Sequence, residues 1–441
     1  MEEEFMSKKQ WKESIEKFFM TFILLQPLLD ISAYFGLPVS EVVRMAALGI
    51  GGIYLLFFTK LNKKVVLYFS LLGGYTIIHL LVNFFMKEPY SLIDEMIYVV
   101  KTLYFVIVLF VYIKVFQSFQ KHPKWKNIVF RNVAISITMI VIVLGIAEIT
   151  DTGKRSYDML AKSGHTGWFF SGNELSAIMA MGVAFFTYQI IHLSSKNKLW
   201  QWLSIIPLLL TSWAMMTIGT KVGFGSLIII TVVMLGYLVF RSIQQNKIHF
   251  QLTTWIIVVI GIIVFTPITA IGQNLNINYP DNVNVPSTLV KKTNKVKANE
   301  EIVPVRVLSG REDFLNEAIN QYKEAPIAQK VFGMGMGGNY KQEAKLVEMD
   351  FFDLFFNFGV IGFLLLLAPV IYFMWDTLKN IYHTKKITFE FTLIIISIGI
   401  GLGTAFVAGH VLSSPAASFY LALAIAFCSV ISLQWRSRGY I

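Results

Sequence analysis

Side chains that could bind an anion and move a proton concentrate between residues 309 and 362. This stretch begins S-G-R-E-D-F, passes through F-G-M-G-M-G-G-N-Y and ends in E-M-D-F-F-D-L-F-F-N-F-G-V-I-G. Arg311 carries a planar, permanently charged guanidinium group that suits bidentate phosphate binding. It also stands at the start of a predicted helix, whose free backbone N–H groups attract anions.

Three acidic residues follow at the entrance to a long apolar run. Glu348, Asp350 and Asp353 would be partly desolvated at a membrane mouth, where burial raises the pKa of a carboxyl group and suits it to act as a general base. The alternative is a structural ion pair with Arg311 or Lys221. Asp353, which lies further along the run, is the stronger structural candidate.

Polar groups elsewhere in the chain extend the set of candidates. Lys221, in T-I-G-T-K-V-G-F-G-S, could neutralise a lipid headgroup or a pyrophosphate, or could be a lysine whose ammonium group simply reaches the interface. His410, in A-G-H-V-L-S-S-P, is a candidate for proton transfer or a hydrogen-bonded packing residue. Gly335 lies in a glycine-rich run whose amides could cradle an anion, or which only turns the loop back to the membrane. Ionisable residues within apolar runs are costly in lipid and are therefore also candidates: Asp30, Arg44, Asp94, Glu95 and Lys101.

The elements that must position these groups are apolar helices. Of the 441 residues, 55% are hydrophobic and 15% are charged, and the mean hydropathy is +0.61. Uncharged runs of roughly 18 to 25 residues, long enough to cross a hydrocarbon core about 30 Å thick, recur along the chain. About twelve are present, near residues 16–36, 41–59, 65–86, 93–116, 128–149, 173–194, 199–219, 222–240, 249–272, 351–375, 388–409 and 412–434. Because backbone groups in lipid must pair internally, the sequence predicts an all-α polytopic membrane protein, with residues 1–441 in a single membrane domain.

The distribution of positive charge predicts the sidedness of the protein. The net charge is +11, and Lys and Arg cluster at both termini and in every second loop, as at Lys60, Lys63 and Lys64. The positive-inside rule therefore places both termini in the cytoplasm, and an even number of crossings agrees with this. The basic excess is a topology signal and does not indicate nucleic-acid binding. The first apolar run lacks a small-residue cleavage site and is expected to be a retained helix, and the single Cys428 excludes a disulfide within the chain.

The orientation places one long loop, residues 273–350, on the outer face. Its first part, to residue 305, is rich in Asn and Lys with scattered prolines and is expected to be poorly ordered. From residue 309 the loop is expected to be helical and functional. Ser309 and Glu312 form a capping box, and Pro326 ends the helix. An apolar stripe predicts that this helix lies on the membrane surface or against the bundle: Phe314, Leu315, Ala318, Ile319 and Tyr322.

Four local patterns over most of the chain resemble the bacterial O-antigen ligase and polymerase superfamily, membrane glycosyltransferases that use polyprenyl-pyrophosphate-linked sugars. G-W-F-F-S-G-N-E-L-S-A resembles the family's glycine–aromatic–Asn entry to a helix and puts Asn173 in its asparagine position. T-I-G-T-K-V-G-F-G resembles a small-residue–Arg segment, with Lys221 in place of arginine. S-G-R matches the loop arginine at Arg311, and F-G-M-G-M-G matches the following G-x-G turn. The segment E-M-D-F-F-D-L-F-F-N-F-G-V-I-G resembles one that usually begins His-Asn, so Glu348 replaces the catalytic histidine.

The resemblance implies extracytoplasmic, metal-independent glycosyl transfer from an undecaprenyl-pyrophosphate-linked glycan to a sugar hydroxyl, with inversion and with no cofactor. Arg311 and Lys221 would hold the pyrophosphate, and Glu348 would deprotonate the hydroxyl. Asp350 and His410 remain alternative bases. The residues expected to bind substrate are Asn173, Arg44, Asp350, His410 and Gly335. The expected partners are the lipid-linked glycan, membrane lipids and other polysaccharide-assembly proteins, at the cytoplasmic membrane.

The sequence leaves the exact activity open. A polymerase and a ligase fit equally, although the E-M-D-F-F-D variant resembles Gram-positive members and favours a polymerase of a cell-surface or wall polysaccharide. A transporter or flippase of lipid-linked sugars is the alternative from another class. The lack of a visible repeat between the two halves, and the placement of the candidates on one face, argue against it. A non-catalytic scaffold for wall assembly is the third interpretation.

Overall fold

The computed structural model describes residues 2–157, 162–194, 198–203, 205–276, 311–340 and 344–437. This part of the chain is almost entirely helical, and its β-structure is one isolated bridge between Arg155 and His165. The predicted all-α fold is confirmed. In chain order the helices are α1 (Glu2–Tyr34), α2 (Val39–Ile53), α3 (Lys63–Met86), α4 (Leu92–Phe119), α5 (Trp125–Ile149), α6 (Gly172–Ser194), α7 (Lys198–Leu203), α8 (Ile205–Thr217), α9 (Lys221–Gln244), α10 (Phe250–Phe265), α11 (Ala270–Asn276), α12 (Arg311–Glu324), α13 (Ile327–Phe332), α14 (Asp350–Thr384), α15 (Phe389–Val407) and α16 (Pro415–Ser437). A π-helical turn, Tyr54–Phe58, extends α2, and a 3-10 turn, Thr266–Ile268, follows α10.

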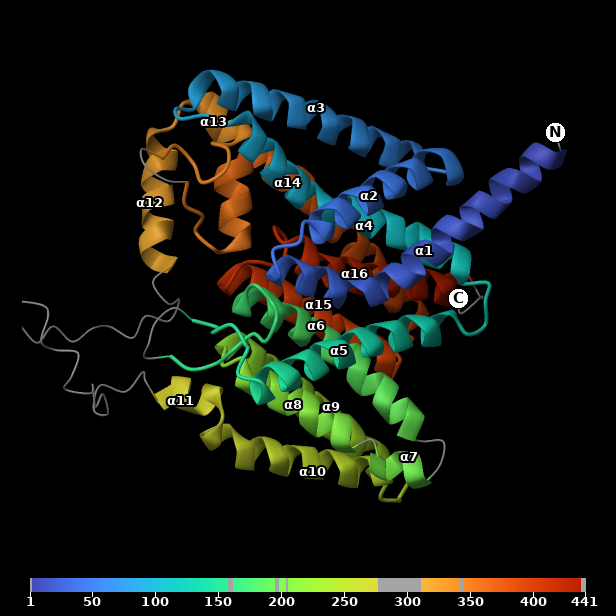
Figure 1. Ribbon diagram of the computed structural model, residues 1–441. Helices are drawn as coiled ribbons and strands as arrows, with labels where there is room; N and C mark the ends of the chain where they lie inside the picture. The colour runs from blue at the N-terminus through green and yellow to red at the C-terminus, as the bar shows by residue number, and fades with distance from the viewer. Residues whose placement is uncertain are drawn as a thin grey trace, which may run out of the picture.

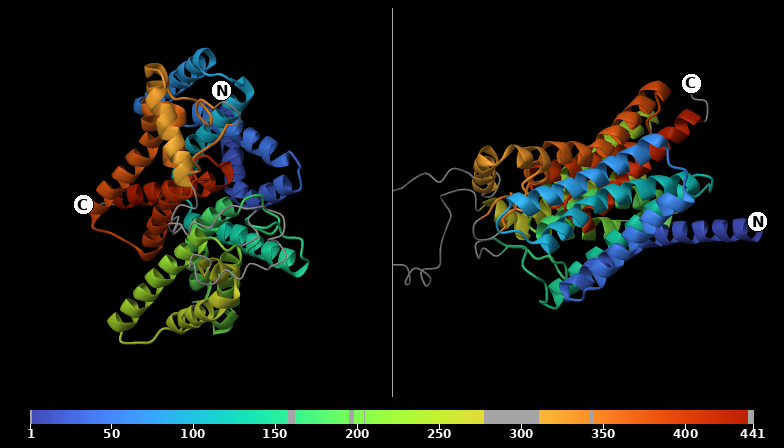
Figure 2. Two further views of the ribbon diagram at one scale, coloured as in Figure 1. Left: turned by 90° about the vertical axis from the view of Figure 1, so that its left-hand side faces the viewer. Right: turned by 90° about the horizontal axis from the view of Figure 1, so that it is seen from above.

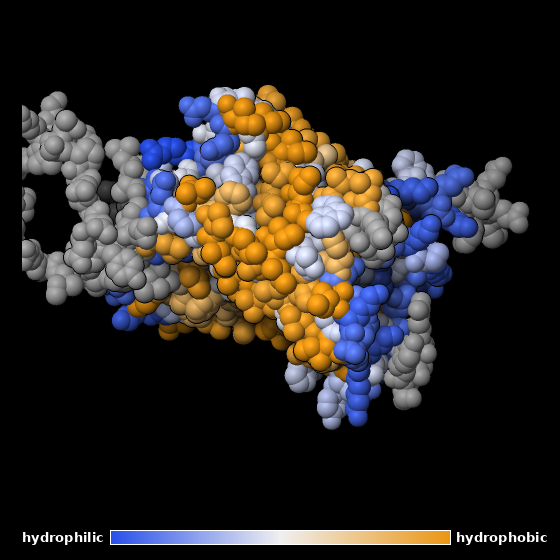
Figure 3. Space-filling model, turned by 90° about the horizontal axis from the view of Figure 1, so that it is seen from below, coloured by the Kyte–Doolittle hydropathy of each residue, from blue (hydrophilic) through white to orange (hydrophobic). Residues whose placement is uncertain are grey.

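Ten helical segments of the described chain are long and apolar enough to cross a membrane. The two further predicted runs are also helical. One forms the second half of α1, where Gln26 and Asp30 interrupt the apolar sequence, and the other divides into α7 and α8. Figure 3 shows the result on the surface, where a belt of hydrophobic residues separates two hydrophilic ends. The chain is therefore a multi-pass membrane protein.

The core of the bundle is α16, which lies between α4, α6, α14 and α15 (Figure 1). Of its most apolar stretch, 94% is buried, compared with 17% in α3 at the edge of the bundle. A helix that is apolar on all sides is covered either by lipid or by other helices, and α16 is covered by its neighbours. Small residues such as Ala422, Ala424 and Ala426 let these neighbours approach closely.

The bundle has two polar ends. One carries α12 and α13 and is called the α12 end here, and the other carries both termini and is called the terminal end (Figures 1 and 2). The basic cluster Lys60, Lys63 and Lys64 lies in the connection before α3 and in its first turn, at the terminal end. The segments 150–157, 162–171, 218–220, 344–349 and 408–414 meet at the α12 end. The orientation of these two ends in a membrane stays a prediction.

The predicted helix of the long loop is α12, and its apolar stripe packs against the bundle. Tyr322 contacts the rings of Phe355 and Phe356 in α14, at centroid distances of 5.3 and 5.5 Å. The helix ends before Pro326, as predicted, and Pro326 then begins α13. Residues 273–276 belong to α11, while the rest of the stretch to residue 305, together with Ser309, lies outside the described residues.

A break in α14 makes room for the glycine-rich turn that follows α13. Gly359 has φ +64° and ψ −176°, a conformation that side chains disfavour, and the backbone of Val331 and Gly333 lies where a Cβ atom would be. The hydroxyl group of Tyr75 donates to the carbonyl oxygens of Phe332 and Phe358, at 3.0 and 2.5 Å. The break therefore joins the loop after α12 firmly to the membrane bundle.

Candidate active site

Three of the predicted residues meet at the α12 end. Arg311 Nη2 lies 3.4 Å from Glu348 Oε2, and His410 Nε2 lies 3.9 Å from the same oxygen. These residues begin α12, precede α14 and follow α15, so the contact is made only by the folded chain. The Arg311 side chain is 12% exposed, whereas that of Glu348 is 45% exposed and can be approached by a substrate.

Glu348 and His410 both have a left-handed backbone, with φ values of +62° and +58°. This conformation is uncommon for residues other than glycine and persists only where the surroundings hold it in place. Gly409, at φ +63°, lies so close that a Cβ atom there would be 2.5 Å from the carbonyl oxygen of Glu348. The two candidate groups therefore sit on tightly fixed turns that touch each other.

Asp350 fixes the turn that carries His410. Its carboxylate accepts hydrogen bonds from the backbone N–H groups of His410 (3.1 Å), Val411 (2.7 Å) and Leu412 (2.7 Å) and from Ser413 Oγ (2.7 Å). Asp350 is 1% exposed, and both oxygens are occupied by protein donors. The geometry favours a scaffolding role over the predicted substrate contact or base.

Asp353 fixes the turn that carries Glu348. Its two carboxylate oxygens accept the N–H groups of Val347 at 2.8 Å and Met349 at 3.1 Å, on either side of Glu348. It is buried, and its contacts agree with its interpretation as a structural partner, although the partner is backbone and not Arg311 or Lys221.

The electrostatics of Glu348 and His410 are those of an ion pair. The nearby His410, opposed by burial, and then the positive charge of Arg311 lower the pKa of Glu348. Burial alone would lower the pKa of His410, but the neighbouring Glu348 carboxylate and the negative charge of Asp350 raise it overall. These shifts favour the charged forms of both groups, with the Glu348 carboxylate between Arg311 and His410.

The described parts of the loop between α5 and α6, residues 150–157 and 162–171, contact the turn that precedes Lys221. Ser156 Oγ donates to the carbonyl oxygen of Ile218 at 2.7 Å, and Tyr157 Oη donates to that of Gly219 at 3.3 Å. Asn274 Nδ2, from α11, also donates to Gly219 O at 2.8 Å. Three segments far apart in sequence thereby fix the start of α9, where Lys221 is exposed.

This loop adds a third cation, Lys162, which was not among the predicted site residues. Burial lowers the pKa of Lys162, and the positive charges of Lys221 and Arg311 lower it further. Its Nζ lies 4.9 Å from the centroid of the Tyr157 ring. Lys162 is therefore close enough to both Lys221 and Arg311 to be repelled by them, an arrangement that an anion with two phosphate groups would relieve.

A second polar cluster adjoins His410 inside the bundle. Arg44 Nη2 lies 2.6 Å from Asp30 Oδ1, and Arg44 Nη1 donates to Ser40 Oγ at 2.7 Å. Glu174, in the first turn of α6, hydrogen-bonds the hydroxyl group of Ser414 and lies within electrostatic reach of Asp30, Arg44 and His410. Arg44 thus has a structural partner, and Glu174 is a group that the sequence analysis did not single out.

Asn173 is half-buried in the first turn of α6, next to Glu174. The helix therefore places it at the α12 end, as the resemblance implied. Its role in binding substrate stays a prediction.

The glycine-rich turn lies away from these residues and binds a carboxylate of the protein itself. The N–H group of Met336 donates to both oxygens of Glu95, at 3.0 and 2.9 Å, and a Cβ atom on Gly335 would lie 2.5 Å from the same carboxylate. Gly338 faces Gln321, ten residues or about 15 Å along α12 from Arg311. The structure therefore favours the alternative interpretation of Gly335, a packed turn, over an anion cradle for substrate.

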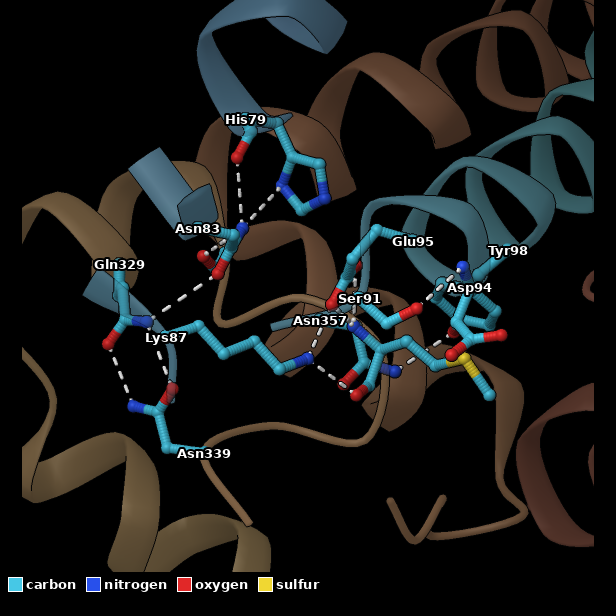
Figure 4. A network of polar contacts seen from close by, with 12 residues as sticks. His79, Asn83, Lys87, Ser91, Asp94, Glu95, Tyr98, Gln329, Asn339 and Asn357 are labelled. Carbon is cyan, nitrogen blue, oxygen red and sulfur yellow. Dashed lines mark hydrogen bonds and ion pairs between the residues drawn. The ribbon is translucent and has the colours of Figure 1, made fainter. Parts of the chain in front are cut away.

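A buried polar network holds this turn to α3 and α4 (Figure 4). Lys87 forms an ion pair with Glu95, both side chains being 2% exposed, and donates to the carbonyl oxygen of Met336 at 2.8 Å. Asn83 donates to the carbonyl oxygen of Gly333 at 3.2 Å. This network joins the loop after α12 to the first membrane helices. Glu95 was named as a candidate from the sequence, but the network itself was not predicted.

The arrangement as a whole can bind an anion and accept a proton at one place. Lys221 is the first residue of α9, whose N-terminal dipole also favours anions, and Arg311 is the first described residue of α12. Within the described part of the chain, no group of three or more His, Cys, Asp or Glu side chains could hold a metal ion.

Comparison with known proteins identifies the family of the chain. No curated protein matches the chain. A family model described as O-antigen ligase like membrane protein matches residues 12–434, nearly the full length, and the chain therefore belongs to this family of glycosyltransferase-type membrane enzymes.

Proposed function

We propose that the protein transfers a glycan from a polyprenyl pyrophosphate, undecaprenyl pyrophosphate in particular, to the hydroxyl group of an acceptor sugar. The observation that carries this proposal is the half-exposed Glu348 carboxylate, held between Arg311 and His410 on fixed turns, with Lys162 and Lys221 nearby. A carboxylate next to clustered cations supplies both a proton acceptor and a binding site for a diphosphate leaving group.

In the proposed reaction, the acceptor hydroxyl oxygen attacks the anomeric carbon of the donor sugar. A new glycosidic C–O bond forms while the bond from this carbon to the phosphate oxygen breaks. Attack from the face opposite the leaving group inverts the anomeric configuration. The electron pair of the broken bond stays on the lipid pyrophosphate, where Arg311, Lys221 and Lys162 stabilise the added negative charge.

Glu348 takes the proton of the acceptor hydroxyl group. A carboxylate whose pKa has been lowered is a weak base, so donor binding must change its surroundings. When Arg311 turns towards the diphosphate, Glu348 loses one of its two cationic neighbours and its pKa rises towards the ordinary value. Binding of the donor would thus prepare the base, and His410 would remain to orient the carboxylate.

The membrane setting agrees with a lipid-linked donor. Glu348 precedes α14 and His410 follows α15, two helices long and apolar enough to cross a membrane, so the polyprenyl chain can stay in the bilayer while its headgroup reaches Arg311. We place the α12 end outside the cytoplasmic membrane and both termini in the cytoplasm, because the basic connections gather at the terminal end. Within this scheme we favour a polymerase of a Gram-positive cell-surface or wall polysaccharide over a ligase, and metal-independent catalysis by the three cations.

A strain lacking the gene, complemented with variants, tests the proposal. Surface glycan and extracted lipid-linked glycan would be compared by gel electrophoresis for the wild type, Arg311→Ala and Glu348→Gln. Lys323→Ala and Glu324→Gln, exposed at the far end of α12, serve as matched controls.

Single repeat units left on the lipid in the two site variants, with normal chains in the controls, would support a polymerase. Long chains that stay on the lipid would support a ligase. An unchanged glycan pattern at normal expression would overturn the proposal and favour a transporter or a scaffold instead.

A further inference from the structure

A second cavity lies at the terminal end of the bundle, far from Arg311 and Glu348. It has a volume of about 390 Å3 and lies between the turn before α5, the start of α15 and the end of α16. This volume falls in the range of about 300–1,000 Å3 that small-ligand sites occupy. Nothing in the proposed glycosyl transfer uses this cavity.

The cavity is lined by more positive than negative side chains. Lys126 and Lys386 line it, together with the imidazole of His122 and the single carboxylate of Glu390. Lys126 Nζ is 4.0 Å from Glu390 Oε1, at the limit of an ion pair, so an anion with better geometry could compete for it. His122 Nδ1 accepts the N–H group of Lys124 at 3.2 Å, which leaves Nε2 as the protonated nitrogen and a possible donor.

Two helices begin at the cavity without a side-chain cap. The residue before α5 is Lys124 and the residue before α15 is Thr388, and neither side chain accepts a hydrogen bond from the first turn of its helix. The first-turn N–H groups of a helix lack intrahelical partners and favour anions. Thr388 lines the cavity, and its hydroxyl oxygen is buried without a hydrogen-bond partner. An oxyanion in the cavity would supply the missing acceptor.

Two buried tryptophans form part of the wall of the cavity. Trp125 and Trp435 line it and are 2% and 5% exposed, and Lys386 Nζ lies 5.9 Å from the Trp435 ring centroid. Tryptophan is enriched where hydrocarbon meets the polar headgroups, and basic pockets between membrane helices bind anionic lipid headgroups. The cavity lies at the ends of α5, α15 and α16, three helices long and apolar enough to cross a membrane, and therefore at the level where phospholipid phosphates lie.

We propose that this cavity binds a phosphate group, carried either by an anionic phospholipid headgroup or by a soluble phosphate ester. Lys126 and Lys386 neutralise its charge, Thr388 and the first-turn amides of the two helices donate hydrogen bonds, and the tryptophans cover the apolar side of the ligand. The bound group joins α5, α15 and α16 at the end of the bundle opposite the catalytic cluster.

The test uses the purified full-length protein and two kinds of ligand. Phosphatidylglycerol and phosphatidylcholine nanodiscs test the lipid source, and glycerol 3-phosphate added to protein in neutral detergent tests the soluble source. Retained lipid is measured by native mass spectrometry, and affinity is taken from the rise in thermal midpoint with ligand concentration.

The variant is Lys126→Gln combined with Lys386→Gln. The control is Lys64→Gln combined with Lys247→Gln, which removes the same charge from exposed positions at the same end. We expect the first pair to weaken binding at least about tenfold, since it removes two charge-assisted contacts, and the control pair to bind like the wild type.

Preference for phosphatidylglycerol identifies a lipid ligand, and binding of glycerol 3-phosphate alone identifies a soluble one. Equal losses in the variant and control pairs would mean that only surface charge attracts the ligand, and would overturn the proposal. Wild-type binding by the Lys126/Lys386 pair would overturn it as well. Thr388→Val, which keeps the shape of the residue, is a second test in case the double variant unfolds. The proposal requires that this variant also bind the ligand more weakly than the wild type does.

Discussion

Replacing Asp350 by asparagine tests whether this carboxylate is a scaffold for His410 and not a base. Its two oxygens accept four hydrogen bonds, two each, from the turn 410–413. Asparagine keeps one acceptor oxygen and places an NH2 group against two donors, so two of the four contacts are lost. Because a hydrogen bond to a charged group contributes about 1.5–3 kcal/mol, the expected cost is about 3–6 kcal/mol.

The assay compares thermal unfolding and glycan transfer for Asp350→Asn and Glu348→Gln. The first variant should lose both stability and transfer, because the turn that carries His410 is released. The second should lose transfer but should cost much less stability than Asp350→Asn, since Glu348 is half exposed and loses only its ionic contacts with Arg311 and His410. If Asp350→Asn keeps the wild-type melting temperature and still abolishes transfer, Asp350 acts chemically and the scaffold argument is wrong.

Three further predictions concern the Glu348–His410 pair, the Lys87–Glu95 ion pair and Gly409. The pKa of Glu348 is lowered, so its ionised form stabilises the fold at pH values above its ordinary pKa, and this stabilisation is lost as the pH falls through the folded-state pKa. The pKa of His410 is raised, so its protonated form stabilises the fold at pH values below its ordinary pKa, and this stabilisation is lost as the pH rises through the folded-state pKa. The difference in thermal midpoint between the wild type and Glu348→Gln should therefore be largest between about pH 4.5 and 6.5, and a flat difference from pH 4 to 9 would contradict this pairing. Lys87→Met strands the buried charge of Glu95 and should cost about 3–5 kcal/mol in unfolding free energy, of which the added change Glu95→Gln restores a part; no recovery would argue against the ion pair. Gly409→Ala puts a methyl group against the turn of Glu348 at a left-handed φ, and transfer in cells should fall sharply at unchanged expression; full activity would show that the two turns can separate.

The membrane helices could be predicted from the sequence because a span depends on a local property, the length of an apolar run. The run near 65–86 becomes α3, and the run near 412–434 becomes α16, within about three residues at each end. Breaks inside helices could not be predicted in the same way. Gly359 departs from helical geometry because α13 packs against it, and that contact joins residues that are 26 or more positions apart.

The chemical types at the site could also be predicted, but the partners of each residue could not. Arg311, Glu348 and His410 stood out as charged groups near apolar runs, and the fold brings them together. Asp350 was interpreted as a substrate ligand because its true partners could not be predicted. Most of the groups that donate hydrogen bonds to it are backbone amides some 60 residues away, and a backbone amide leaves no signal in the pattern of side chains. Lys162 was missed for the opposite reason, since a lysine in a polar loop is ordinary until its neighbours are known.

The spacing of E-M-D-F-F-D explains why three acidic residues can do different work. Glu348 precedes the helix and remains half exposed, whereas Asp350 and Asp353 lie in the first turn of α14 and are buried. Asp353 holds the backbone on both sides of Glu348, and Asp350 holds the turn of His410. One helix start thus anchors both candidate groups, and it fixes their distance from each other regardless of where α12 lies. Arg311 alone arrives on a separate element, so movement of α12 can change its contact with Glu348 without disturbing the base or its histidine neighbour.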